Sequence, residues 1–295
     1  MNRKKLRANI LLLLAALFWG STFVAQRIAA GAIDPFPFQC LRCLLGALVL
    51  YACVPLFDKY LSRSTWSSRP LWLGGVLCGI CLFASTNLQQ FGISLGTTAG
   101  KSGFITALYI VLVPVFSIFL GRRSGALVWI SVILAVAGLF FLCMTESFSL
   151  AIGDFVTLLC AVCFAVHILL VDKFSPGVDP IRLSCIQFLV CGLLSGAASF
   201  VTGLPTGAQI AASWFPIVYA GILSSAVAYT FQIIAQRNTD PAVASVLMST
   251  ESVFACLSGW IILGERLSGR ELLGCALMFC AVLLSQLPDR RKADA

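Results

Sequence analysis

Long apolar stretches fill most of the chain, and short polar or Gly/Pro-containing segments separate them. Each stretch is close to the roughly 20 residues that a helix needs to cross the hydrocarbon core of a bilayer. Because lipid offers no partner to an unpaired backbone N–H or C=O group, such stretches are expected to be helices. The pattern predicts ten transmembrane helices, at residues 9–30, 36–57, 70–92, 97–120, 126–144, 153–171, 181–201, 214–235, 241–263 and 269–287.

Composition agrees with a membrane protein. Of the 295 residues, 59% are hydrophobic and only 11% are charged, whereas a soluble domain carries roughly a quarter of charged residues. A net charge of +8 would suggest a nucleic-acid partner if it lay on a soluble face. Here the basic residues cluster at the ends of apolar stretches, so we expect contact with a lipid bilayer and no nucleic acid as partner.

The basic residues are distributed unequally between the two sides of the predicted bundle, and this asymmetry sets the orientation. If the N-terminus is cytoplasmic, fifteen Lys and Arg residues fall in cytoplasmic segments and two in external loops. The cytoplasmic residues are Arg3, Lys4, Lys5, Arg7, Lys59, Arg63, Arg69, Arg122, Arg123, Lys173, Arg182, Arg237, Arg290, Arg291 and Lys292, and the external ones are Arg266 and Arg270. Both termini are therefore predicted to be cytoplasmic.

The chain also matches itself at a shift of 143 to 145 residues. Cys40 falls on Cys185 and Gln89 on Gln232, and other pairs follow across five predicted helices. The pattern predicts one repeat at residues 1–148 and a second at 149–295. Because each repeat holds five helices, an odd number, the second copy must enter the membrane from the opposite side. Inverted repeats of this kind are typical of secondary transporters, whose substrate sites lie near the midplane between the halves.

Three charged residues within the predicted helices are candidates for substrate binding, because a charge at a helix centre costs at least about 2.5–3.5 kcal/mol. Glu251 lies ten residues into its stretch, about 15 Å deep. Arg42 lies about 9 Å and Lys101 about 6 Å from the outer face. The alternative is that these groups pair with one another and only fix helix packing. Arg27 lies within a turn of the outer boundary and can reach the interface.

Uncharged polar residues within the predicted helices form a second set of candidates. Gln89 and Gln232 are equivalent by the repeat and could line the path from both halves, and Asn87 lies near Gln89. His167, the single histidine, could relay a proton. For each of these residues, a hydrogen bond that joins two helices is the alternative interpretation.

Two motifs resemble cofactor-binding sites, but their spacing and surroundings argue against cofactor binding. The thirteen cysteines include CxxC pairs, but each pair lies in an apolar stretch without an adjacent acidic residue or histidine, which favours packing over metal binding. Residues 96–102 (GTTAGKS) resemble a phosphate-binding loop, but the required first glycine position is occupied by Leu95, and an apolar helix precedes it in place of a strand. We expect no metal, no nucleotide and no other cofactor.

Several segments together resemble the EamA branch of the drug/metabolite transporter superfamily. They are residues 19–24 (WGSTFV), which begin with Trp19, then Arg42, residues 98–104 (TAGKSGF), Pro114, residues 153–154 (GD) and residues 263–266 (LGER). The resemblance covers nearly the whole chain and implies ten helices, an inner-membrane location and transport of amino acids or similar metabolites, often outward. It also adds Trp19 to the candidate substrate-binding residues.

The chain departs from that family at two places. Glu251-Ser252 stands where Glu-Pro is common, and Arg122-Arg123 stands where Gly-Glu is usual in the first half. The resemblance therefore does not carry over the identity of the substrate.

The sequence thus predicts a secondary transporter without catalytic residues, acting as a monomer or homodimer. It would move a small polar or zwitterionic, amino-acid-like metabolite outward across the inner membrane by alternating access, with protons as a candidate coupling ion. An intramembrane enzyme and a non-transporting scaffold are the alternatives. The enzyme leaves the inverted repeat unexplained, and the scaffold predicts no pathway through the bundle.

Overall fold

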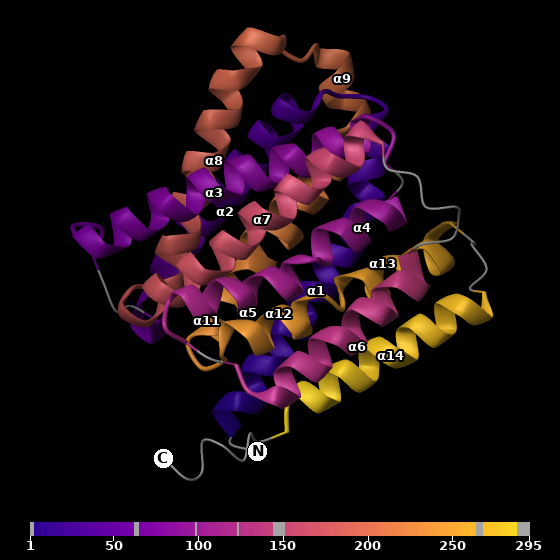
Figure 1. Cartoon of the computed structure of the whole chain (residues 1–295). Helices are drawn as coiled ribbons and strands as arrows, with labels where there is room; N and C mark the ends of the chain where they lie inside the picture. The colour runs from indigo at the N-terminus through magenta and orange to yellow at the C-terminus, as the bar shows by residue number, and fades with distance from the viewer. Residues whose placement is uncertain are drawn as a thin grey trace.

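The computed structural model describes residues 3–61, 65–97, 99–122, 124–143, 151–263 and 268–287, apart from the side chains of residues 59–61, 99–101, 143, 259, 262 and 263. All regular secondary structure in these ranges is helical (Figure 1). Before residue 150 the helices are α1 (Arg3–Ala30), α2 (Pro35–Leu61), α3 (Arg69–Ser94), α4 (Ala99–Ala107), α5 (Tyr109–Phe119) and α6 (Ala126–Cys143).

The second part of the chain is also helical and has more interruptions. It contains α7 (Ile152–Phe174), a 3₁₀ turn η1 (Ser175–Gly177), α8 (Pro180–Thr202), α9 (Gly207–Ala212), α10 (Trp214–Tyr219), a π-helical segment η2 (Ala220–Ala228), α11 (Tyr229–Gln236), α12 (Pro241–Met248), α13 (Glu251–Leu263) and α14 (Gly269–Ser285). Segments α10, η2 and α11 follow one another without a break.

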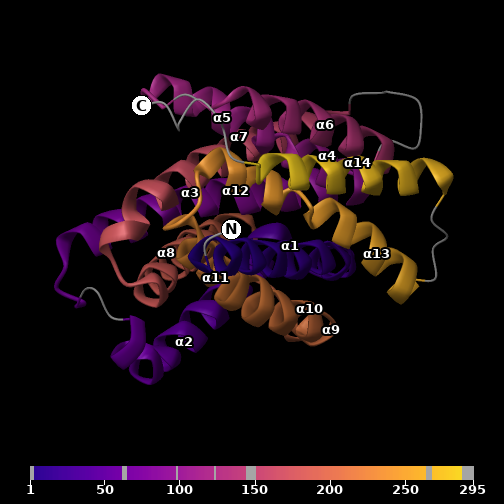
Figure 2. The same ribbon diagram turned by 90° about the horizontal axis from the view of Figure 1, so that it is seen from below.

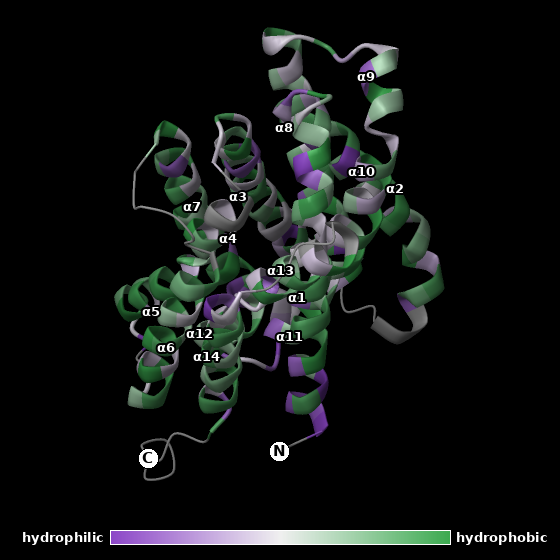
Figure 3. Cartoon of the chain, turned by 90° about the vertical axis from the view of Figure 1, so that its right-hand side faces the viewer, coloured by the Kyte–Doolittle hydropathy of each residue, from purple (hydrophilic) through white to green (hydrophobic). Residues whose placement is uncertain are grey.

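Eight helical segments within the described ranges are long and apolar enough to cross a bilayer. They are Arg3–Ala30, Pro35–Asp58, Arg69–Ser94, Ser102–Phe119, Ile152–Gly177, Pro180–Thr202, Trp214–Gln236 and Pro241–Ser258, and a shorter apolar helix covers Ala126–Leu142. Hydrophobic residues cover most of the helical ribbon (Figure 3). The predicted class, an all-helical polytopic membrane protein, is confirmed, while ten spans remain a prediction.

Packing between helices follows a paired pattern. Helix α2 packs on α8, and α6 lies beside α14 (Figures 1 and 2). Helix α3 packs on α7, and α1 packs on the segment from α10 to α11. Helix α1 runs through the middle of the bundle and also contacts α13 and α12 (Figure 2). The first turn of α1 and the last turn of α14 lie on the same side of the bundle (Figure 3).

Two of the membrane helices are broken, and in both the break is a tightened turn. Between α4 and α5, the Val111 backbone N–H donates to the Leu108 carbonyl three residues earlier. Between α12 and α13, the hydroxyls of Ser249 and Thr250 donate to the carbonyls of Val246 and Leu247, at 2.9 and 2.6 Å. A buried carbonyl needs such a partner where the helical hydrogen bonds stop.

Among the described residues, Arg182 and Arg122 form ion pairs that join the two halves of the chain near the ends of the helices. Arg182 on α8 contacts Asp58 on α2 at 2.6 Å. Arg122, which follows α5, pairs with Asp172 on α7. Both pairs lie in segments that the sequence predicts to be cytoplasmic.

Helix α1 crosses α13 at very short range, and Gly20 makes this possible. A Cβ atom at Gly20 would lie 2.4 Å from the carbonyl oxygen of Glu251 and 2.7 Å from the Phe254 Cβ. Such distances are shorter than atoms tolerate, so any side chain at this position would push α1 and α13 apart. The glycine thereby fixes where α13 begins relative to α1.

We predict that Gly20→Ala lowers the free energy of unfolding by about 1–3 kcal/mol, because overpacking a close contact forces the backbone to shift. The measurement is thermal unfolding of the purified full chain in detergent. Gly31→Ala serves as the matched control, since a Cβ there would meet its nearest atom at an ordinary 3.7 Å. An unfolding temperature equal to that of the wild type for Gly20→Ala would contradict the crossing described above.

Candidate functional site

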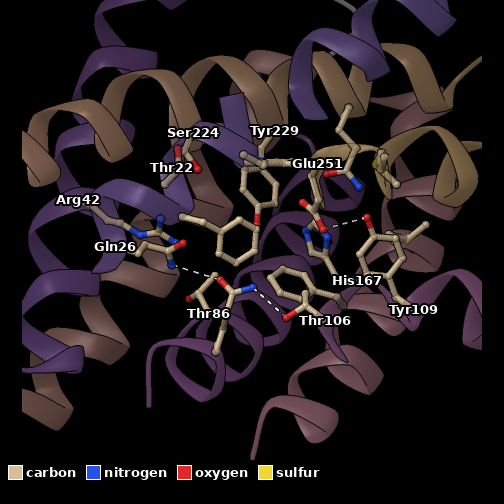
Figure 4. Close-up of a pocket in the computed structure, with 17 residues that line it drawn as sticks. Thr22, Gln26, Arg42, Thr86, Thr106, Tyr109, His167, Ser224, Tyr229 and Glu251 are labelled. Atoms are coloured by element: carbon tan, nitrogen blue, oxygen red, sulfur yellow. Dashed lines mark hydrogen bonds between the residues drawn. The ribbon is translucent and has the colours of Figure 1, made fainter. Parts of the chain in front are cut away.

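A pocket of about 530 Å³, counting its opening, lies within the bundle (Figure 4). Its lining comes from α1, α2, α3, α4, α5, α7, η2, α11, α12 and α13, so both parts of the chain contribute. The lining residues are Trp19, Thr22, Phe23, Gln26, Arg42, Thr86, Gln89, Thr106, Tyr109, Phe164, His167, Ile168, Ser224, Tyr229, Gln232, Met248 and Glu251.

Arg42 provides the positive charge of this pocket. Its side chain is only 3% exposed, its Nε donates to Gln39 Oε1 at 2.5 Å, and its guanidinium lies 5.7 Å from the centre of the Phe38 ring. The Gln39 amide is itself held by the Thr86 carbonyl, to which it donates at 3.0 Å. Within the described ranges, Arg42 forms no ion pair with a carboxylate, so its charge has no negative partner in the chain described.

Glu251 provides the negative charge. It is the first residue of α13, so it follows the break after α12, and it is 6% exposed. Its Oε1 accepts a hydrogen bond from the Tyr109 hydroxyl at 3.2 Å, and the N-terminus of α13 favours a negative charge at this point. No basic side chain in the described part of the chain pairs with it.

The two charges face the same pocket from different sides. Arg42 and Gln26 lie on one side, and Glu251, Tyr109 and His167 lie on the other (Figure 4). Arg42 and Glu251 therefore do not pair with each other in the structure, in contrast to the alternative considered from the sequence. An uncompensated buried charge is costly, and a ligand with both signs of charge would satisfy the two groups together.

Glutamine side chains join α1, α3 and α4 beside the Arg42 side of the pocket. Gln26 Nε2 donates to Gln89 Oε1 at 3.2 Å and to Gln90 Oε1 at 3.3 Å. Gln89 Nε2 in turn donates to the Thr106 hydroxyl at 3.2 Å. The chain of bonds satisfies these buried amides and fixes the wall of the pocket.

Aromatic rings form the wall nearer to Glu251. The Tyr229 ring meets Trp19 edge-on at 4.8 Å between centroids and His167 at 5.7 Å. His167 Nε2 lies 3.1 Å from Gln187 Oε1, so the imidazole is held by α8. The pocket therefore combines an apolar wall with a few fixed polar groups, as is usual for small-molecule sites.

The pocket gathers six of the eight residues that the sequence singles out, namely Trp19, Arg42, Gln89, His167, Gln232 and Glu251. Asn87 does not line it. The Asn87 amide donates to the Phe83 carbonyl at 2.8 Å and to the Ser195 hydroxyl at 3.0 Å, so it joins α3 to α8. Lys101 lies in α4, and its side chain is outside the described part of the structure.

Sequence reasoning missed several lining residues, for a physical reason. Tyr109, Thr22 and Ser224 cost little in lipid when their hydroxyls find a backbone or side-chain partner, so cost alone does not mark them. Gln26 stands next to Arg27. The charge of Arg27 marked it as costly in lipid, whereas the neutral Gln26 carried no such signal. Arg27 is exposed on α1, whereas Gln26 is 3% exposed and lines the pocket.

The pocket offers hydrogen-bond donors, acceptors and one charge of each sign. Among the described residues, no group of three or more His, Cys, Asp or Glu side chains lies close enough to hold a metal ion. The donors, acceptors and charged groups of the lining suit noncovalent binding of a small polar molecule.

Comparisons with known proteins agree with this architecture. Residues 6–144 and residues 151–287 each match the EamA-like transporter family. An uncharacterized transporter of Archaeoglobus fulgidus is 30% identical over 96% of this chain and 87% of its own length. The threonine/homoserine exporter RhtA of Salmonella typhimurium is 30% identical over 85% of this chain and 82% of its own length.

Two further matches extend the picture. The uncharacterized inner membrane transporter YedA of Escherichia coli K12 is 26% identical over 95% of this chain and 92% of its own length. A solved crystal structure that is 22% identical superposes with a TM-score of 0.79 and covers 97% of this chain and 98% of its own, which shows a shared fold. The predicted resemblance is confirmed: the chain belongs to the EamA-like transporter family of the drug/metabolite transporter superfamily, and it is a membrane transporter rather than an enzyme.

Proposed function

We propose that the chain is a secondary transporter that moves a small zwitterionic, amino-acid-like metabolite outward across the inner membrane by alternating access. The observation that carries this proposal is the pocket in which Arg42 and Glu251 both lack an oppositely charged partner among the described side chains. The names of two relatives add support, an inner membrane transporter and an exporter of threonine and homoserine.

The charges specify the chemistry of the proposed substrate. The Arg42 guanidinium binds a carboxylate, for which its fork of N–H donors is suited. Glu251 binds the substrate ammonium or exchanges the coupling proton. A ligand without charged groups would leave both buried charges uncompensated, and an anion would leave Glu251 uncompensated. A zwitterion, which carries one charge of each sign, satisfies the pocket better than either.

The proposed architecture is a pair of inverted five-helix repeats, at 1–148 and 149–295. The packing supports it, because α2 packs on its equivalent α8 and α6 on its equivalent α14. The breaks support it too, since Leu108 between α4 and α5 is 143 residues before Glu251, next to the break between α12 and α13. Broken helices at corresponding positions of two repeats are the best pointer to a transporter's binding site.

Ten transmembrane helices and two cytoplasmic termini belong to the same proposal. The positions of the first and last helices support an even number of spans, because α1 begins and α14 ends on the same side of the bundle (Figure 3). Which side that is follows from the fifteen-to-two asymmetry of basic residues in the sequence.

We predict that, at either terminus, a reporter that works in the cytoplasm is active and a reporter that works in the periplasm is inactive. The measurement compares a reporter that works in the cytoplasm with one that works in the periplasm, at the N-terminus and at the C-terminus separately. Periplasmic activity at one terminus would disprove the even number of spans, and periplasmic activity at both would reverse the orientation.

We predict that Arg42→Gln reduces the exchange of labelled zwitterionic amino acids by about ten- to a hundredfold, because a charge-assisted hydrogen bond to the carboxylate is lost. Exchange is measured in proteoliposomes loaded with unlabelled substrate. Arg27→Gln is the matched control: the side chain is exposed on α1, so exchange should stay within twofold of the wild type. Normal exchange by a folded Arg42→Gln variant would remove this residue from the site.

We predict that Glu251→Gln separates coupling from binding. If Glu251 exchanges a proton, the variant keeps exchange between two loaded sides and loses uphill transport driven by a pH gradient. If Glu251 binds the substrate ammonium, both activities fall. Both are measured in the same proteoliposomes, with Glu271→Gln as control because Glu271 caps the exposed start of α14. Unchanged uphill transport by a well-folded Glu251→Gln variant would exclude Glu251 from the mechanism.

A further inference from the structure

Gln89 and Gln232 are equivalent positions of the two repeats, yet their amides have different surroundings. Both polar atoms of the Gln89 amide are used, Oε1 by Gln26 and Nε2 by Thr106. The Gln232 side chain is 1% exposed and also lines the pocket, but its Oε1 has no hydrogen-bond partner in the described part of the chain. A buried, unpaired carbonyl oxygen calls for a specific explanation.

The surroundings of Gln232 restrict what could pair with it. Gln232 follows Tyr229 by one turn on α11, so the two side chains lie on the same face of the helix. The Tyr229 ring contacts Trp19 and His167, and Met248 also lines this pocket. His167 Nε2 lies within hydrogen-bond distance of Gln187, and these neighbours give the Gln232 amide an apolar and aromatic surrounding.

Trp19 supplies the complementary donor. Its indole Nε1 is buried and also has no hydrogen-bond partner in the described ranges. Two residues that line the pocket, Gln232 and Trp19, therefore each carry a buried polar atom without a partner among the described residues, one an acceptor and one a donor. A hydroxyl group is both a donor and an acceptor, so it has the chemistry that both atoms require. An aliphatic group would leave both unsatisfied, at the cost of their lost hydration.

We propose that Gln232 determines the specificity of the site: its amide oxygen accepts a hydrogen bond from a hydroxyl on the side chain of the substrate. The Trp19 indole N–H donates to the same hydroxyl, while Arg42 and Glu251 bind the charged groups that all such amino acids share. The inference rests on the proposed function, and it narrows the substrate to short amino acids with a hydroxyl group. Gln89, by contrast, is a positioning residue that holds the pocket wall.

The test uses threonine and valine, which have nearly the same shape and differ in one hydroxyl. The full chain is reconstituted in proteoliposomes loaded with threonine, and the uptake of labelled threonine is measured against rising concentrations of unlabelled threonine or valine. We expect the wild type to prefer threonine by about tenfold or more, since a site that hydrogen-bonds a substrate group rejects the analogue lacking it. In Gln232→Leu, we expect the preference to fall below about threefold, because the unpaired oxygen is gone.

The repeat-related variant Gln89→Leu is the matched control. It breaks the bonds to Gln26 and Thr106, so it should weaken the exchange of threonine and valine by the same factor and leave the preference unchanged. Thermal unfolding and gel filtration show which variants fold. Gln232→Met provides a second apolar replacement with the same expected loss of preference.

The outcomes separate this inference from the function on which it rests. A wild type that exchanges threonine and valine equally well transports zwitterions but lacks the proposed hydroxyl site, and this result overturns the inference alone. The same holds for a folded Gln232→Leu or Gln232→Met variant that keeps the wild-type preference, which would mean that water satisfies the amide. If the wild type exchanges neither amino acid nor any other zwitterion, the proposed function itself is wrong.

Discussion

A charged side chain inside a bilayer is costly unless water, a partner or a ligand reaches it, and the whole arrangement of this bundle depends on how that cost is met. Arg42 and Glu251 are both buried and both lack an ion partner among the described residues. Each instead forms a hydrogen bond with a neutral side chain, Arg42 with Gln39 and Glu251 with Tyr109. Hydrogen bonds of this kind orient a charge without neutralising it. The pocket therefore keeps two uncompensated charges, which the opposite charges of a substrate can neutralise.

The backbone has to adapt in order to place those groups. Helices that run unbroken through a membrane present their side chains at regular intervals, which limits how many can converge on one volume. Here the break before α5 delivers Tyr109, the break before α13 delivers Glu251, and the wide turns of η2 lead to Tyr229. π-helical segments are frequent at functional sites. Small polar side chains such as Ser249 and Thr250 satisfy the carbonyls that the break leaves open.

The sequence predicted the helices well, because the apolar length needed to cross lipid is a strong constraint that hardly depends on tertiary contacts. Most described helices fall within the predicted ranges to within a few residues. The start of α1 and the end of α2 continue beyond the apolar core, and the short helix α9 lies in a segment that was predicted as a loop. The breaks inside α4–α5 and α12–α13 were not predicted, since Leu108 and Ser249 carry no helix-breaking signal of their own.

For the site, the free-energy cost of burying polar groups in lipid identified the strongly polar residues Arg42, Glu251 and the paired glutamines. It could not tell which face of a helix a polar residue occupies. Asn87 and Gln89 are two residues apart on α3, so they point in different directions, one to Ser195 on α8 and the other into the pocket. Tyr109 and Gln26 became visible only when the helices were assembled, because their roles depend on partners far away in the chain.

The close crossing of α1 and α13 has a consequence for how sequence changes combine. Gly20 lies against the carbonyl of Glu251, while its neighbours Trp19 and Thr22 line the pocket. A packing position and a ligand-binding position therefore share one backbone contact, and residues in direct contact do not contribute independently to free energy. We therefore expect the two positions to be epistatic, so that the effect of a substitution at 251 depends on whether position 20 carries a side chain.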